Sequence, residues 1–185
     1  MSRTMRPIPR ILLGAAILSL PSCLPTELCG CSPVPPPLIT TDRDAYTATH
    51  VRDEGTYRQY GFTLIARFQN RTGDAIYLDR CYPDASRPIY GVELLGATRP
   101  LESGYDPVWA CVGHDNPIVV QPGAERVDTL RITGPTSWDG RTGEAMGRLE
   151  GRFRLVYQAS SCPREARCPL PEEMRRSNPF EVTVR

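Results

Sequence analysis

Alternation of apolar and polar residues is the feature that most constrains how this chain folds. In residues 60–69, four apolar side chains share one face, interrupted only by Ile65: Phe62, Leu64, Ala66 and Phe68. A period of two with one apolar face predicts a half-buried strand. Residues 70–74 (NRTGD) then form a turn, and the chain returns as a second strand in residues 75–81.

The same reasoning predicts a series of further strands punctuated by glycine and proline, with no long helical period. The pattern of residues 171–176 indicates only a single helical turn. About eight short strands in series are typical of an antiparallel β-sandwich, so we expect an all-β domain with disulfides. The further strands are expected at residues 46–52, 89–95, 108–112, 117–121, 126–132, 149–158 and 179–184.

The N-terminus has the organisation of a leader peptide. Residues 1–10 are polar and basic, and residues 11–20 (ILLGAAILSL) form an apolar run that is too short for the roughly 20 residues of a membrane span. We therefore expect a signal peptide over residues 1–22. Beyond it the chain carries 19 basic and 21 acidic side chains, a net charge of −2. This balance argues against nucleic acid as a partner.

The residues Leu20-Pro21-Ser22-Cys23 resemble the lipobox of bacterial lipoproteins. The resemblance implies cleavage before Cys23 and its modification with fatty acids such as palmitate, giving a membrane anchor. Residues 23–44 then form a proline-rich tether and residues 45–185 the β domain. In a Gram-negative host, the presence of Leu24 rather than aspartate after the cysteine implies transport onward to the outer membrane of the cell envelope. The alternative is a secreted protein whose Cys23 joins a disulfide.

Setting Cys23 aside leaves six of the seven cysteines, an even number that suits an oxidising compartment. We expect a disulfide between Cys81 at the end of one strand and Cys111, which follows Trp109 in the expected strand 108–112. Cys162 and Cys168 either bridge each other or capture Cys29 and Cys31.

Three stretches resemble bacterial immunoglobulin-like domains: FTLIARFQNRTGD, the Gln121-Pro122-Gly123 turn into RVDTLRI, and the strand from Gly151 to Leu155. The resemblance spans most of residues 45–185 and implies an antiparallel immunoglobulin-like sandwich. More loosely, the order of turns resembles the small proteinase-inhibitor sandwich of the BsuPI type. The cysteines and the long final loop depart from that pattern.

Catalytic motifs are missing from the sequence. It has no nucleophile elbow, no His-Glu-x-x-His and no glycine-rich phosphate loop. With only His50 and His114 among the histidines, we expect no metal site and no cofactor. We expect a protein that is not an enzyme, and a hydrolase using His114 and Asp115 is the weakest alternative.

Two loops remain as candidate binding segments. Trp138 lies in residues 133–147, either as a binding anchor or folded back to close one end of the sandwich. A Cys162–Cys168 bridge would close a ring around Arg164 and Arg167. The sequence thus favours a non-enzymatic envelope lipoprotein that holds an envelope protein or glycan. The alternative is a protease inhibitor that presents Arg164 or Arg167 to a trypsin-like pocket.

Overall fold

The structure is a computed structural model that describes residues 37–54, 57–98, 102–111, 116–139, 141–142, 144–163 and 168–185. In these ranges the chain is mostly β, as predicted. None of the described helices is long and apolar enough to cross a bilayer. The elements are β1 (Ile39–Thr41), β2 (Ala45–Glu54), β3 (Tyr57–Gln69), β4 (Ile76–Leu78), β5 (Tyr90–Leu94), β6 (Ile118–Val120), β7 (Glu125–Gly134), β8 (Gly151–Tyr157), β9 (Ala159–Ser160), α1 (Glu172–Arg175) and β10 (Phe180–Val184).

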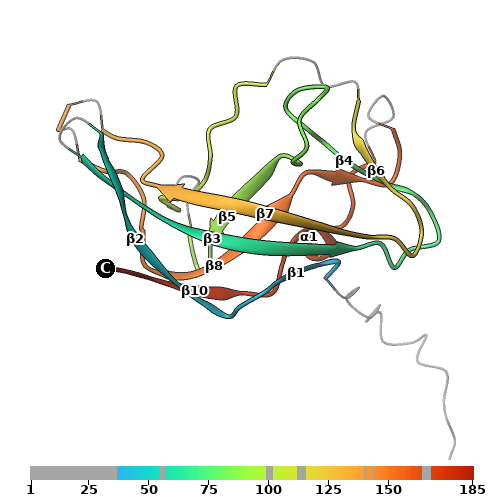
Figure 1. Cartoon of the computed structure of the whole chain (residues 1–185), viewed down its shortest axis with the longest axis horizontal. Coiled ribbons are helices and arrows are strands. Elements are labelled where there is room, and N and C mark those ends of the chain that lie inside the picture. Colours follow the sequence, from blue (N-terminus) through green and yellow to red (C-terminus); the bar gives the residue numbers. More distant parts are fainter. Residues whose placement is uncertain are drawn as a thin grey trace, which may run out of the picture. The chain divides into compact units, whose positions relative to one another are not determined.

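The long strand β3 organises the larger sheet. It pairs antiparallel with β7 along ten residues, from Tyr60–Gly134 to Gln69–Glu125. Its other edge is shared by β1 and β2. From β2 the path continues through a parallel pairing with β10 and then antiparallel pairings to β8 and β5 (Figure 1). A smaller sheet has the order β6-β4-β9.

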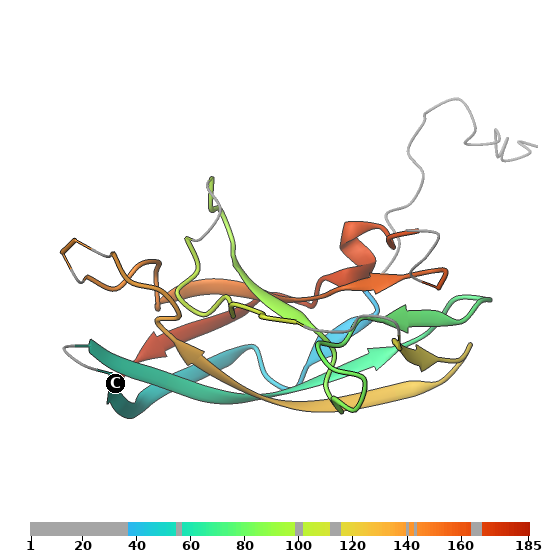
Figure 2. The same cartoon turned by 90° about the horizontal axis from the view of Figure 1, so that it is seen from above.

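The strands lie in two layers, with β3 and β7 in one and β5 and β8 in the other (Figure 2). The apolar faces meet between them. Phe68 of β3 stacks on Tyr157 of β8, with 6.2 Å between the ring centroids. The ring of Tyr105 lies between Phe62 and Phe153 and meets both edge-on. Burying one such apolar side chain contributes about 1.5–3 kcal/mol to the stability of the fold. The predicted face of β3 is therefore the core face, whereas Ile65 points outward and is half-buried.

Asn70 makes the predicted turn after β3 and is itself fully buried. Its side-chain oxygen accepts bonds from the N–H and hydroxyl of Thr72, and its amide donates to the carbonyls of Asp74 and Val120. Its backbone N–H donates to the carbonyl of Ala124. One buried side chain thereby joins the β3–β4 turn to the β6–β7 turn.

The expected strand at residues 108–112 is absent from its described part, residues 108–111. Val108 is 78% exposed and Trp109 is 38% exposed, so this segment is no core strand. The Trp109 indole instead donates to the carbonyl of Tyr90 at 2.7 Å, and its ring meets Tyr90 edge-on. The segment therefore contacts β5 through side chains, which a pattern of apolar letters does not distinguish from a strand.

The expected boundary between tether and domain at residue 45 falls too late. Ile39–Thr41 form β1, which pairs with Ala66–Phe68, and both Leu38 and Ile39 are buried in the core. The apolar pair Leu38-Ile39 directly follows the proline run and is long enough to enter the sheet. The β unit begins before β1, and the part of the tether before residue 37 lies outside the described residues.

The long connection between β8 and β10 is built into the domain. It contains β9 and the predicted helical turn, observed as α1. Leu170 is buried, and the Ser177 hydroxyl accepts a bond from the N–H of Leu155 at 3.0 Å. The connection is therefore held on both sides of the segment 164–167, by pairing of β9 with β4 before it and by the bond of Ser177 to β8 after it. The segment 164–167 itself lies outside the described residues.

Candidate functional site

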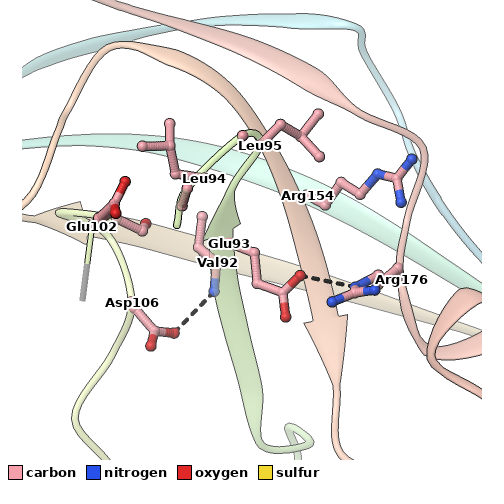
Figure 3. Close-up of a pocket in the computed structure, with 11 residues that line it drawn as sticks. Val92, Glu93, Leu94, Leu95, Glu102, Asp106, Arg154 and Arg176 are labelled. Atoms are coloured by element: carbon pink, nitrogen blue, oxygen red, sulfur yellow. Dashed lines mark hydrogen bonds and ion pairs between the residues drawn. The ribbon is translucent and has the colours of Figure 1, made fainter. Parts of the chain in front are cut away.

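A pocket of about 510 Å³ opens beside β5 and is lined by five charged side chains (Figure 3). Residues from β5, β8, the segment after α1 and the segment 102–106 contribute to it. Its lining includes Glu93, Leu94, Glu102, Asp106, Arg154 and Arg176.

Alternation along β5 and β8 places Glu93 and Arg154 on the outward face of the sheet. Val92 and Leu94 of β5 are buried, so Glu93 points away from the core. In the β5–β8 register Glu93 lies opposite Arg154. However, Glu93 pairs with Arg176, whose Nε lies 2.9 Å from its carboxylate. Tertiary pairing of β5 with β8 and with the segment after α1 therefore builds one wall of the pocket.

Arg176 is surrounded by three glutamate side chains. Besides Glu93 it contacts Glu172 at 2.6 Å and Glu173 at 3.8 Å. The hydrogen bond to Glu93 raises the pKa of the Arg176 guanidinium, and the charges of the glutamates add to the effect. Pairs of this exposure contribute little stability, about 0–1 kcal/mol each. Their effect is to hold Arg176 in one position.

Arg154 is less completely paired than Arg176. One of its terminal nitrogens lies 3.5 Å from the Glu173 carboxylate, the outer limit of a hydrogen bond. Its buried Nε makes no hydrogen bond with any of the described residues. A guanidinium with spare donors at a pocket wall is suited to receive a carboxylate or phosphate.

Asp106 forms the facing, acidic wall together with Glu102, and Figure 3 shows both across β5 from the two arginines. The Asp106 carboxylate accepts a bond from the N–H of Val92 at 3.1 Å. Burial raises the pKa of Asp106 above its ordinary value, against the effect of that bond. Gly91 permits this approach, since a Cβ there would lie 2.9 Å from the Asp106 oxygen.

The pocket thus has a cationic wall and an acidic wall above apolar side chains of β5. Such an arrangement binds and orients a polar ligand through hydrogen bonds. Sequence reasoning did not select any of its residues. The expected strand at residues 149–158 contains Arg154, but alternation identifies only the face of a residue and not its neighbours.

Both disulfides among the expected cysteines are present. Cys81 bridges Cys111 with 4.5 Å between their Cα atoms, and Cys162 bridges Cys168. Two arrangements were expected for Cys162 and Cys168, and the structure has the one in which they bridge each other. Cys23, Cys29, Cys31, His114, Arg164 and Arg167 lie outside the described residues.

Trp138 is half-buried, and its backbone forms an isolated antiparallel bridge with Ala145. The intervening turn is held by Asp139, whose carboxylate accepts bonds from the N–H groups of Arg141 and Thr142. Trp138 does not line the pocket beside β5. The other residue considered at the sequence level, His50, is exposed and contacts Asp53 at 3.1 Å.

The fold and the pocket define a disulfide-bonded, mostly β protein with a charged surface pocket. Comparisons with family models, with curated proteins and with solved structures find no match to the chain.

Proposed function

We propose that this protein is a lipid-anchored lipoprotein of a bacterial cell envelope whose β domain binds a protein or glycan partner without transforming it. The leader, the lipobox-like Leu20-Pro21-Ser22-Cys23 and the proline-rich segment after it support the anchor. Two disulfides in the β unit suit an oxidising compartment outside the cytoplasm.

The observation that carries the binding role is the pocket beside β5, with Arg154 and Arg176 on one wall and Glu102 and Asp106 on the other. Its charged groups are held by strands and ion pairs, so a ligand would meet a largely preformed site. The partner we propose presents an acidic group to Arg154 and hydrogen-bond donors to Asp106. Stem peptides and acidic glycans of the envelope both have this chemistry.

For the arrangement of strands we propose an immunoglobulin-like sandwich. The two layers, the antiparallel pairing of β3 with β7 and the Greek-key-like return of β10 to β2 support it. The parallel β2–β10 pairing continues one hydrogen-bonded path from one layer to the other.

The binding role is tested by recovering partners from envelope extract with the full lipidated chain and two variants. Arg154→Gln removes the charge from the pocket wall, and Arg152→Gln removes one from an exposed position of the same strand outside the pocket. We expect recovery to fall at least tenfold with Arg154→Gln and to stay unchanged with Arg152→Gln. Equal recovery with both folded variants would remove the pocket from the proposal.

A second candidate function is protease inhibition by the segment between Cys162 and Cys168. The disulfide between them closes a ring of small size, and the Ser160–Pro169 bridge anchors its base. Closing a loop in advance lowers the entropy lost on binding. Trypsin inhibition by the full chain would support this candidate, provided that a Gly/Ser replacement of residues 163–167 abolishes it.

A further inference from the structure

A second pocket, of about 680 Å³, lies where β1 and β2 part on the edge of β3. β1 pairs with β3 only as far as Thr41–Ala66, and β2 pairs with it only from Thr49–Gly61 onward. Between these points β2 pairs with β10, through Ala45 to Ala48. The β3 ladder is therefore open over a short stretch centred on Thr63.

One end of the opening is closed by Asp42. Its carboxylate accepts bonds of 2.8 Å from the N–H of Ile65 and from the Tyr46 hydroxyl. Its own N–H donates to the carbonyl of Ile65 at 3.0 Å. Asp42 thus bonds both backbone groups of Ile65, which has no strand partner on this edge within the described part of the chain. Thr63 is the next residue of β3 whose backbone faces the same edge.

Thr63 directs its backbone groups into the opening. Residues of an antiparallel strand turn their N–H and C=O alternately to the two edges. The bonds of Ile65 to Asp42 and of Gln69 to Leu38 show that odd-numbered residues of β3 face β1 and β2. Thr63 belongs to this set and has no strand partner there among the described residues.

Thr47 faces Thr63 from the other side. The carbonyls of Asp44 and Ala48 accept bonds from β10 and the residue after it, so the even-numbered residues of β2 face β10. Thr47 therefore turns its N–H and C=O toward β3. Two backbone donors and two backbone acceptors border the opening, and the side chains of Thr47 and Thr63 are exposed there.

Aromatic rings form the floor of the opening, and arginine side chains lie at its rim. The rings of Tyr46 and Phe62, 5.1 Å apart, lie beneath it and are 5% and 7% exposed. Arg131 lies opposite Thr63 in the β3–β7 register, is exposed, and makes no ion pair with the described residues. Arg43 also lines the pocket, 3.4 Å from the Asp42 carboxylate.

We propose that this opening binds an anionic sugar. Hydroxyl groups both donate and accept, which matches the facing N–H and C=O groups of Thr47 and Thr63. The apolar floor suits the C–H face of a sugar ring, and Arg131 receives the acidic group, a carboxylate or a phosphate. The site is separate from the pocket beside β5 but deepens the proposed glycan-binding role.

The test uses the full lipidated chain in detergent micelles and four probes: oligogalacturonate, a sugar phosphate, a neutral galactose oligomer and inorganic phosphate. We expect one of the two acidic sugars to bind and to shift and protect the backbone amides of Thr47 and Thr63, measured by NMR and hydrogen exchange. The sugar that binds identifies carboxylate or phosphate as the acidic group. Arg131→Gln should weaken that binding at least tenfold.

Arg67→Gln is the matched control, because Arg67 lies on the same face of β3 but outside the pocket and pairs with Glu125. It should leave the affinity unchanged. Equal binding of the neutral oligomer, equal binding of inorganic phosphate, or undisturbed Thr47 and Thr63 amides would each overturn the proposal, as would failure of both acidic sugars to bind. Arg154→Gln should not alter this binding, so its loss of partner recovery tests the first pocket separately.

Discussion

At the scale of single residues, polar side chains complete strands where no neighbouring strand is available. Asp42 accepts from the N–H of Ile65, Asp106 from Val92, and the Ser177 hydroxyl from Leu155. In the same way Glu150 accepts from the N–H of Val184. Where such a backbone group is buried, leaving it unpaired costs about 1–3 kcal/mol, so these side chains stabilise strand edges that the sheet alone leaves incomplete.

Gly91→Ala tests this role at Asp106. The new Cβ would lie 2.9 Å from the Asp106 oxygen, so the carboxylate must leave the N–H of Val92. We expect a loss of about 1–3 kcal/mol in the free energy of unfolding, measured by urea denaturation. The control Gly73→Ala meets no atom within 4 Å and should change stability by under about 0.5 kcal/mol. Equal effects of the two substitutions would contradict this account.

Asp42 contributes a pH dependence of known sign. Burial raises the pKa of its carboxyl, but the bonds from Ile65 and Tyr46 and the charge of Arg43 lower it further, leaving it below the ordinary value of 3.8. A lowered pKa in the folded state stabilises the fold above 3.8, and this stability is lost as the pH falls through the folded value. Asp42→Asn should therefore flatten the acid side of a thermal-stability profile.

The contribution of Asp106 to stability depends on pH in the opposite direction, because burial raises the pKa of its carboxyl in the folded state. Its contribution to stability is greatest at low pH and is lost as the pH rises through the folded value. Asp106→Asn should thus make the acid-side decline steeper, not flatter. Identical profiles for the two asparagine variants would show that neither carboxyl governs the acid transition.

At the scale of elements, β1 shows how a short strand joins a domain to the chain before it. Three residues suffice to hold β1 in the sheet, because Ile39 is fully buried and Ile39–Thr41 pair with Ala66–Phe68. The side chain of Asn178 adds a bond from the N–H of Thr41 at 2.8 Å. β1 is thus held both by β3 and by the segment before β10.

Ile39→Ala measures the contribution of β1 to the fold. Removing a fully buried isoleucine side chain down to its Cβ costs about 2–5 kcal/mol. Thr40→Ala, on an exposed position of the same strand, should cost far less. If Ile39→Ala leaves the urea midpoint unchanged, β1 is not part of the cooperative unit.

The two disulfides differ in the length of chain that they close. Cys81–Cys111 spans a sequence separation of 30 and Cys162–Cys168 one of 6. Because the entropy removed from the unfolded chain grows with loop length, we expect double serine variants to lose about 3–4 kcal/mol and about 2 kcal/mol, respectively. Chemical denaturation without reductant measures both. A larger loss from Cys162→Ser/Cys168→Ser would reverse the expected order.

At the scale of the whole molecule, the proposed lipid on Cys23 determines where both pockets act. Cys23→Ala should abolish incorporation of labelled palmitate and leave an uncleaved or mislocalised precursor. Fractionation of cells that express the full chain measures the second effect. Normal processing of the variant, together with an unlabelled wild type, would show that the protein is secreted without an anchor.

The sequence by itself determined which residues of the long strand β3 enter the core. Alternation identified the inner face of β3, and turn residues such as Asn70 and Gly123 separated the strands, because both signals are local. Apolar letters alone also suggested a strand at residues 108–112 and missed β1, since burial of a short segment depends on what covers it.

Only the tertiary structure decided which strands became neighbours. The period of two assigns a face to Glu93, Arg154, Thr47 and Thr63 but carries no information about the partner strand or register. The pairing of β5 with β8 placed Glu93 opposite Arg154, and the pairing of β2 with β10 opened the ladder at Thr63. Both pockets arise from contacts between residues far apart in the chain, and such contacts are chosen by the packing of the complete core.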